Sequence, residues 1–165
     1  MPEVFDRPEL RDAQESDLPF LFRLYADVRG PEIASWGWPA AESQSFLRMQ
    51  FEAQRRSYQA AYANSRHEII SIEHTPVGRR LVASAPGDMR LVDIALLSSY
   101  RNRGIGRSLV QQLIDECRAN GLLLQLQVLQ GNPARGLYER MGFEETSSDA
   151  MYIQMACSPT TEKVA

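Results

Sequence analysis

The feature that most constrains this chain is a glycine loop between a run of strand-forming residues and an amphipathic helix. The loop reads Tyr-Arg-Asn-Arg-Gly-Ile-Gly-Arg-Ser-Leu over residues 100–109. Val, Ile and Leu dominate residues 91–97, and downstream the apolar residues fall on one helical stripe that ends at Asn120-Gly121. The first amides of a helix lack intrahelical partners and lie at the positive end of the helix dipole. This strand, loop and helix therefore predict an α/β unit that can bind an anion at its turn.

The composition of the loop points to phosphate as that anion. Gly104 and Gly106 allow the backbone to approach a ligand closely. Arg101, Arg103 and Arg107 concentrate positive charge in a chain whose net charge is −3. Guanidinium groups bind phosphate in a bidentate way. The loop therefore predicts a ligand that carries a pyrophosphate.

Several better-known phosphate and hydrolase motifs are absent. A dinucleotide fingerprint needs a third glycine and an acidic residue about 20 positions later, whereas residues 122–129 offer only Leu, Val and Gln. No Gly-Lys-Ser/Thr follows the loop, and no Gly-x-Ser-x-Gly occurs in the chain. A nucleotide-binding module that uses the same loop remains an alternative, weakened by the missing carboxylate.

Length and composition favour one domain spanning residues 1–165, with a core over 8–156 and a flexible tail over 157–165. The two cysteines and two histidines have no metal-ligand or redox spacing, so we expect no metal. The isoelectric point near 5.5 argues against nucleic acid. With no signal peptide and no long apolar run, we expect no membrane contact and a cytoplasmic location.

The hydrophobic periods predict the order of the elements. A first strand over 8–13 precedes a helix that starts after an N-cap at Ser16-Asp17 and ends near Arg29-Gly30-Pro31. A loop over 30–39 then leads to a helix over 40–62, whose apolar face we expect to hold Phe46, Met49, Ala53 and Ala60. An antiparallel meander follows from 67 to 97, with turns at Thr75-Pro76 and Pro86-Gly87-Asp88.

After the glycine loop and its helix, we expect a strand over 122–129 that is buried on both faces. A short helix from Asn132 to Met141 and strands around Gly142-Phe143 and 150–156 complete the chain.

At this point the chain resembles the GCN5-related N-acetyltransferase (GNAT) family. Residues 101–106, Arg-Asn-Arg-Gly-Ile-Gly, match the family's acyl-CoA pyrophosphate loop, Arg/Gln-x-x-Gly-x-Gly/Ala. About 30 residues later, residues 132–143 resemble its Asn-x-x-Ala/Arg-x-x-Leu-Tyr-x-x-x-Gly-Phe segment. The resemblance implies an α/β fold with a mixed, mostly antiparallel central sheet, splayed between its fourth and fifth strands and flanked by about four helices.

The resemblance also implies acetyl-CoA as the acyl donor and places it on named residues. The pantetheine arm would pair with the backbone of Leu96, Leu97 and Ser98, and Asn132 and Arg135 would contact the same cofactor. The pyrophosphate would lie on the loop and first helical turn, at Arg101, Arg103, Gly104, Ile105, Gly106, Arg107 and Ser108. Tyr138 would point its hydroxyl at the thioester sulfur.

These positions imply acetyl transfer to a primary amine of a small molecule or protein. Tyr138 would act as the general acid for the departing thiolate, or alternatively pack on the sheet as a structural aromatic. Asp93 is a carboxylate in an apolar strand, which is costly unless it is paired or used in chemistry. It is a candidate base or substrate contact, and a salt bridge with an arginine is the alternative. A backbone N–H near Leu96 or Leu97 would serve the oxyanion.

Fewer sequence features indicate which residues bind the acceptor substrate. Trp36 and Trp38 would wall the acceptor pocket or pack over the sheet. The second helix carries Arg55, Arg56, Tyr58 and Tyr62, which we interpret as a solvated face. We interpret His67 and His74 as strand-edge residues.

A catalytically idle acyl-CoA sensor of the same fold is the alternative function. Homodimers are common in the family, and the C-terminal strands would offer an exposed edge for one.

Overall fold

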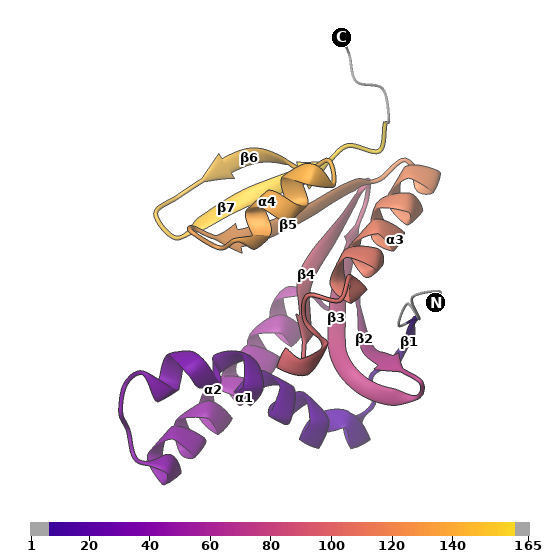
Figure 1. Ribbon diagram of the computed structural model, residues 1–165. Helices are drawn as coiled ribbons and strands as arrows, with labels where there is room; N and C mark the ends of the chain where they lie inside the picture. The colour runs from indigo at the N-terminus through magenta and orange to yellow at the C-terminus, as the bar shows by residue number, and fades with distance from the viewer. Residues whose placement is uncertain (1–6, 161–165) are drawn as a thin grey trace, which may run out of the picture. The chain divides into compact units, whose positions relative to one another are not determined.

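The computed structural model describes residues 7–160, which form seven strands and four α-helices (Figure 1). The strands lie in one sheet in the order β1-β2-β3-β4-β5-β7-β6. Their bounds are β1 Pro8–Asp12, β2 Ser65–Ile72, β3 Thr75–Ala85, β4 Asp88–Leu96, β5 Leu123–Leu129, β6 Glu144–Ser148 and β7 Tyr152–Cys157. The helices are α1 Leu18–Ala34, α2 Ala40–Ala61, α3 Ile105–Asn120 and α4 Ala134–Arg140. The expected mixed α/β architecture is confirmed.

The sheet is mostly antiparallel and contains one parallel pair. β1 with β2, β5 with β7 and β6 with β7 run antiparallel, whereas β4 and β5 run parallel. The β4–β5 register covers only Asp88–Arg90 and Leu123–Gln125, at the first residues of each strand. This short pairing is the one expected of a sheet that opens between its fourth and fifth strands.

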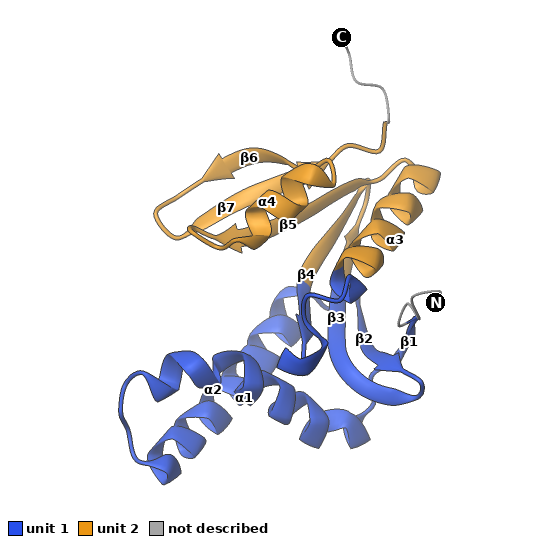
Figure 2. Ribbon diagram, in the orientation of Figure 1, with its two compact units in different colours: residues 1–81, 93–106 blue, residues 82–92, 107–165 orange. Residues whose placement is uncertain are grey.

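The chain forms two compact units, coloured separately in Figure 2. The first consists of the described residues up to 81 together with 93–106, and the second of 82–92 together with the described residues from 107. β7 runs to Cys157, whose side chain is 4% exposed, so the ordered strand extends one residue beyond the predicted core. Residues 161–165 of the expected tail lie outside the described residues.

In the first unit, α1 and α2 bury aromatic and aliphatic side chains against β2. The buried cluster comprises Leu21, Phe22, Ile33, Leu47, Phe51 and Ile69. The rings of Phe22 and Phe51 meet edge to face at 5.5 Å between centroids. Because Phe51 is 2% exposed, truncating it would remove the contact that joins both helices to the sheet.

Two predictions about these helices are wrong. α1 continues through Pro31 to Ala34, since burial of Ile33, 2% exposed, keeps its last turn on the core. The buried face of α2 is formed by Leu47 and Phe51. Of the predicted face, Phe46 packs partly buried against this core, whereas Met49, Ala53 and Ala60 are exposed. Leu47 and Phe51 are four residues apart and so share one face, one position away in register from the predicted face.

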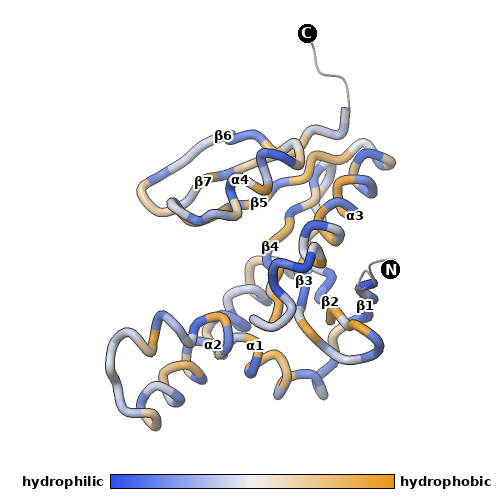
Figure 3. Tube along the Cα trace, in the orientation of Figure 1, coloured by the Kyte–Doolittle hydropathy of each residue, from blue (hydrophilic) through white to orange (hydrophobic). Residues whose placement is uncertain are grey.

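The position of the β2–β3 turn and the burial of β5 also differ from the predictions. The β2–β3 turn lies at Glu73 and His74, both with positive φ, and Thr75 already belongs to β3. In β5, buried Leu124, Leu126 and Val128 alternate with more exposed residues, so one face is buried rather than both. The predicted α3 is confirmed, and its alternating polar and apolar residues are visible in Figure 3.

Asp17 binds an arginine instead of capping α1. Its carboxylate accepts hydrogen bonds from Arg11 Nη1 and Nη2 at 2.8 and 2.7 Å and from the Gln14 backbone N–H at 2.8 Å. The Arg11 hydrogen bonds lower the pKa of Asp17 to about 2. The carboxylate therefore ties β1 to the start of α1.

This contact predicts acid sensitivity. A carboxyl group with a folded pKa below its unfolded value stabilises the fold above about pH 4 and loses that contribution as the pH falls toward 2. We expect Asp17→Asn to lower the free energy of unfolding by about 2 kcal/mol at neutral pH and to flatten its decline between about pH 4 and 2. Urea denaturation across this range measures both effects. Asp12→Asn, at an exposed neighbour in β1, should change neither.

Candidate functional site

The glycine loop is held in shape by contacts inside the first unit. Arg101 donates from Nε to the Leu96 carbonyl at 3.0 Å and pairs through Nη2 with Asp27 Oδ2 at 3.3 Å. The same Asp27 carboxylate accepts from the Ser98 backbone N–H at 2.8 Å and its hydroxyl at 3.2 Å. Asp27, on α1, thus positions the segment between β4 and the loop, a role that sequence reasoning missed.

Positive backbone angles shape the tip of the loop. Gly104 has φ +83° and Asn102 has φ +62°, a region that glycine and asparagine adopt most readily. A Cβ at Gly104 would meet no heavy atom within 4 Å. The backbone at Gly104 is therefore open to a ligand, and its conformation suits glycine.

The charged residues of the loop lie at the surface. Arg101, Arg103, Arg107 and Ser108 are exposed, while Ile105, 2% exposed, anchors the start of α3. The Arg103 guanidinium lies 5.0 Å from the centroid of the Tyr100 ring. Exposed arginines and helix N-terminal amides with a glycine backbone suit a phosphate-bearing ligand.

The structure restricts which amides of the preceding segment a ligand can use. The Leu97 N–H donates to the Val77 carbonyl at 2.8 Å, and the Ser98 N–H is taken by Asp27. Successive amides of a strand point to opposite edges, so the Leu96 N–H points away from β3. Of the two amides predicted for the oxyanion, the Leu97 N–H is therefore already engaged by β3.

In the second unit, α4 carries the other predicted cofactor residues. Asn132 Oδ1 accepts the Ala134 backbone N–H at 2.9 Å and so shapes the entry to the helix. Arg135 pairs with Glu139 at 2.7 Å and with Glu145 at 3.2 Å. Asn132 is exposed and Arg135 half-buried, so both can be reached from solvent.

Tyr138 is half-buried on α4, and its ring is anchored on the core of the second unit. The ring meets buried Phe143 edge to face, with 5.6 Å between centroids. The Tyr138 carbonyl also accepts the Phe143 N–H at 3.0 Å. These contacts anchor the residue and are compatible with both interpretations of it.

Asp93 forms the salt bridge that the sequence left open. Its Oδ2 accepts from Nε and Nη2 of Arg79 at 2.8 and 2.7 Å, and the Arg79 side chain is 9% exposed. Oδ1 of Asp93 has no partner among the described residues. Asp93 also lines a small cavity of about 90 Å³ with Ala95, at the end of β4.

The two tryptophans pack on each other and on α2. Trp36 and Trp38 lie 5.2 Å apart, and each ring meets Phe46 edge to face at 5.6 and 5.3 Å. They remain 41% and 44% exposed. The cluster thus presents an aromatic surface at the loop between α1 and α2.

Comparison with known proteins decides the family. The Acetyltransferase (GNAT) family pattern matches residues 23–143, which include β4, the glycine loop and α4. The chain belongs to the GNAT family. No described helix of this GNAT protein is long and apolar enough to cross a membrane.

Its relatives are acetyltransferases with different names and substrates. The chain is 28% identical over 146 residues to an L-methionine sulfoximine/L-methionine sulfone acetyltransferase of Pseudomonas paraeruginosa, covering 82% of this chain and 79% of the relative. It is 38% identical over 74 residues to the ribosomal protein bS18-alanine N-acetyltransferase of Escherichia coli, covering 44% and 47%. The PaiA N-acetyltransferase of Thermoplasma acidophilum, solved with coenzyme A, superposes with a TM-score of 0.69 at 15% identity, covering 92% and 99%. That likeness supports the fold.

Proposed function

We propose that this protein transfers the acetyl group of acetyl-CoA to a primary amine in the cytoplasm. The observation that carries the proposal is the loop at Gly104, whose open backbone and positive φ precede the first turn of α3 among exposed arginines. A helix N-terminus of this kind stabilises a pyrophosphate. The family membership makes acyl-CoA the expected source of that pyrophosphate.

The proposed cofactor contacts follow the family motifs. In this proposal the amides and guanidinium groups of residues 101–108 bind the pyrophosphate, and backbone groups of Leu96, Leu97 and Ser98 meet the pantetheine arm. The engaged Leu97 and Ser98 amides leave the Leu96 N–H as the donor in this segment. Asn132 and Arg135 are the further cofactor contacts that the family motif implies.

Tyr138 supplies the proton for the leaving group. The acceptor amine attacks the thioester carbonyl, and the C–N bond forms while the carbonyl oxygen takes the negative charge. The Leu96 N–H is the donor proposed for that oxygen. When the C–S bond breaks, the Tyr138 hydroxyl gives its proton to the CoA thiolate, and the amine nitrogen releases a proton to solvent. The Tyr138 phenolate then takes up a proton from solvent, which restores the phenol.

In this proposal Asp93 positions the acceptor amine. Arg79 occupies its Oδ2, so Oδ1 is the oxygen that can accept a hydrogen bond from the amine in the cavity beside Ala95. The aromatic surface at Trp36 and Trp38 is the proposed outer contact for the acceptor. The relatives' printed activities make amino-acid-like amines and protein N-termini the first acceptors to screen.

Calorimetric titration tests the cofactor assignment first. We expect acetyl-CoA and CoA to bind in the micromolar range, about −8 kcal/mol, while ATP and NAD give no heat. Thiol release with an amine panel then measures transfer. Nucleotide binding without acetyl-CoA binding would instead favour the nucleotide-binding alternative, and acetyl-CoA binding without transfer to any amine would favour the acyl-CoA sensor.

A further inference from the structure

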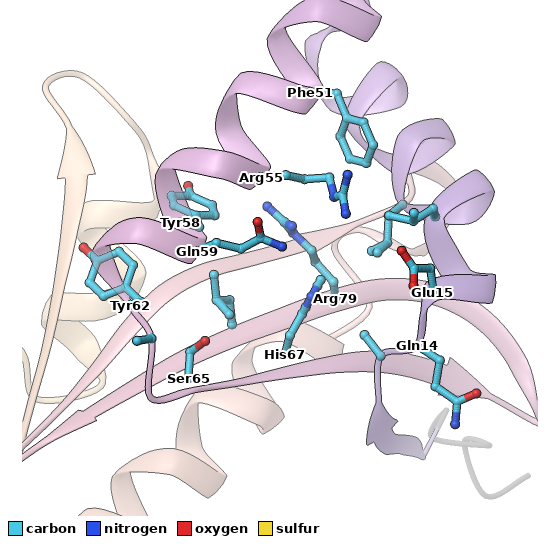
Figure 4. A pocket seen from close by; sticks show the side chains of 15 residues that line it. Gln14, Glu15, Phe51, Arg55, Tyr58, Gln59, Tyr62, Ser65, His67 and Arg79 are labelled. Atoms are coloured by element: carbon cyan, nitrogen blue, oxygen red, sulfur yellow. The ribbon is translucent and has the colours of Figure 1, made fainter.

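A second cavity, of about 420 Å³, lies within the first unit under the C-terminal half of α2 (Figure 4). Its walls come from α2, the start of α1 and strands β2 and β3. None of the residues proposed for acetyl-CoA lines it, and neither do Trp36 and Trp38. Its size is within the range of small-molecule sites.

Two guanidinium groups lie on the cavity wall. Arg55 and Arg79 line it, and Glu15 at its edge is the only carboxylate among the described lining residues. Figure 4 shows Arg55, Arg79 and His67 gathered in the middle of the cavity, with Glu15 to one side. Arg55 is also paired with Glu52 and Arg79 with Asp93, so the wall offers an anion unused guanidinium N–H donors rather than a surplus of charge.

Both arginines retain donors for a ligand. Arg55 gives Nη1 to Glu52 at 2.8 Å, and its Nε and Nη2 have no partner among the described residues. Arg79 uses Nε and Nη2 for Asp93 and Gln54, which leaves Nη1 without a partner in the described part of the chain. Such planar donors match the two oxygens of a carboxylate.

His67 adds a buried polar atom whose partner is missing. Its Nε2 has no hydrogen-bond partner among the described residues. Burial lowers the pKa of His67 to about 4, and repulsion from Arg79 adds to the effect. Asp93, Asp17 and Arg55 also act on the ring. The imidazole is therefore neutral near pH 7, and an anion beside Arg79 would relieve the repulsion.

The remaining walls suit an organic ligand with an apolar body. Phe51, Leu18, Leu21 and Leu81 supply apolar surface, and Tyr58, Tyr62, Gln59 and Ser65 supply polar groups. We propose that this cavity binds a small organic carboxylate, held by Arg55 and Arg79 beside His67, at a site separate from the acetyl-transfer chemistry. The proposal does not depend on the proposed function.

Nuclear magnetic resonance of the full chain without acetyl-CoA tests this site. The chain has two histidines, and His74, with a side chain 90% exposed on the β2–β3 turn, is an internal reference. We expect 3-phenylpropionate to shift the ring signals of His67 saturably and to raise its pKa, while His74 stays unchanged. The neutral 3-phenylpropionamide should bind about tenfold more weakly or not at all.

Two neighbouring variants distinguish binding in the cavity from a general effect of the protein's charge. Arg55→Gln should weaken 3-phenylpropionate binding by about tenfold, because it removes a charge-assisted contact. Arg56→Gln changes the same charge at an exposed neighbour outside the cavity and should leave binding unchanged. Arg79 is unsuitable for this test, because its loss would leave Asp93 unpaired.

Three results would overturn the proposal. The first is the absence of any His67 response at about 10 mM 3-phenylpropionate, well above a useful affinity. The second is equal binding of the acid and the amide, which would mean an apolar site without charge recognition. The third is equal weakening by the Arg55 and Arg56 substitutions.

Discussion

Tyr138→Phe is expected to lower kcat for acetyl transfer by about 10² to 10⁴, because it removes the proton that the CoA thiolate needs. Acetyl-CoA affinity should change little. The Tyr138 ring is held by its edge-to-face contact with Phe143, which phenylalanine preserves. Steady-state thiol release measures kcat, and calorimetry measures the affinity.

The second unit offers a matched control. Tyr152 is its other tyrosine, on β7 and outside the proposed site, so Tyr152→Phe removes the same hydroxyl from a different place. We expect that variant to retain its kcat. If Tyr138→Phe kept full turnover, or lost acetyl-CoA binding as strongly as turnover, Tyr138 would not be the general acid.

Gly104→Asp is expected to weaken acetyl-CoA binding by at least about 100-fold, because it places a carboxylate where the pyrophosphate should lie. The position has open space and a φ of +83°. Asparagine and aspartate tolerate this conformation better than other residues with a Cβ. Gly104→Asn therefore introduces nearly the same shape without the charge.

Comparison of the two variants isolates electrostatics. We expect Gly104→Asn to bind acetyl-CoA much more tightly than Gly104→Asp, with similar thermal stability for both. Calorimetry in low and high salt should also show the aspartate penalty shrinking as screening increases. Equal losses in both variants would assign the effect to loop conformation and contradict the proposed charge contact.

The elements that the sequence predicted well depend on local rules. The α3 stripe ends at Asn120 before Gly121, whose φ is +65°, as the glycine C-cap pattern predicts. The glycine loop and the order of strands and helices follow from similar short-range signals. Local chemistry thus sufficed for the framework and for the position of the glycine loop before α3.

The details that the sequence missed depend on long-range partners. Asp27 meets Ser98 across 71 positions of sequence, and Arg79 meets Gln54 across 25. No periodicity indicates which carboxylate a given arginine will choose. For the same reason Asp93 could be recognised as costly in an apolar strand, but its partner Arg79 could not be named.

The larger cavity shows how a surface pattern can mislead. Arg55, Tyr58 and Tyr62 follow the spacing of a solvated helix face, and in the structure they line a cavity above β2 and β3. His67 looked like a strand-edge residue, yet its Nε2 is buried. Side chains on one helix face line a cavity only when the helix and the sheet that it covers leave space between them. That space depends on packing across the whole unit.

Arg79 lines both the small cavity at Asp93 and the larger cavity under α2. One guanidinium group thus shares its donors between two compartments, and a ligand that reorients it on one side changes what Asp93 meets on the other. Coupling through Arg79 between ligand binding in one cavity and ligand binding in the other acts equally in both directions. Any factor by which a carboxylate under α2 alters acceptor affinity must equal the factor by which the acceptor alters carboxylate affinity.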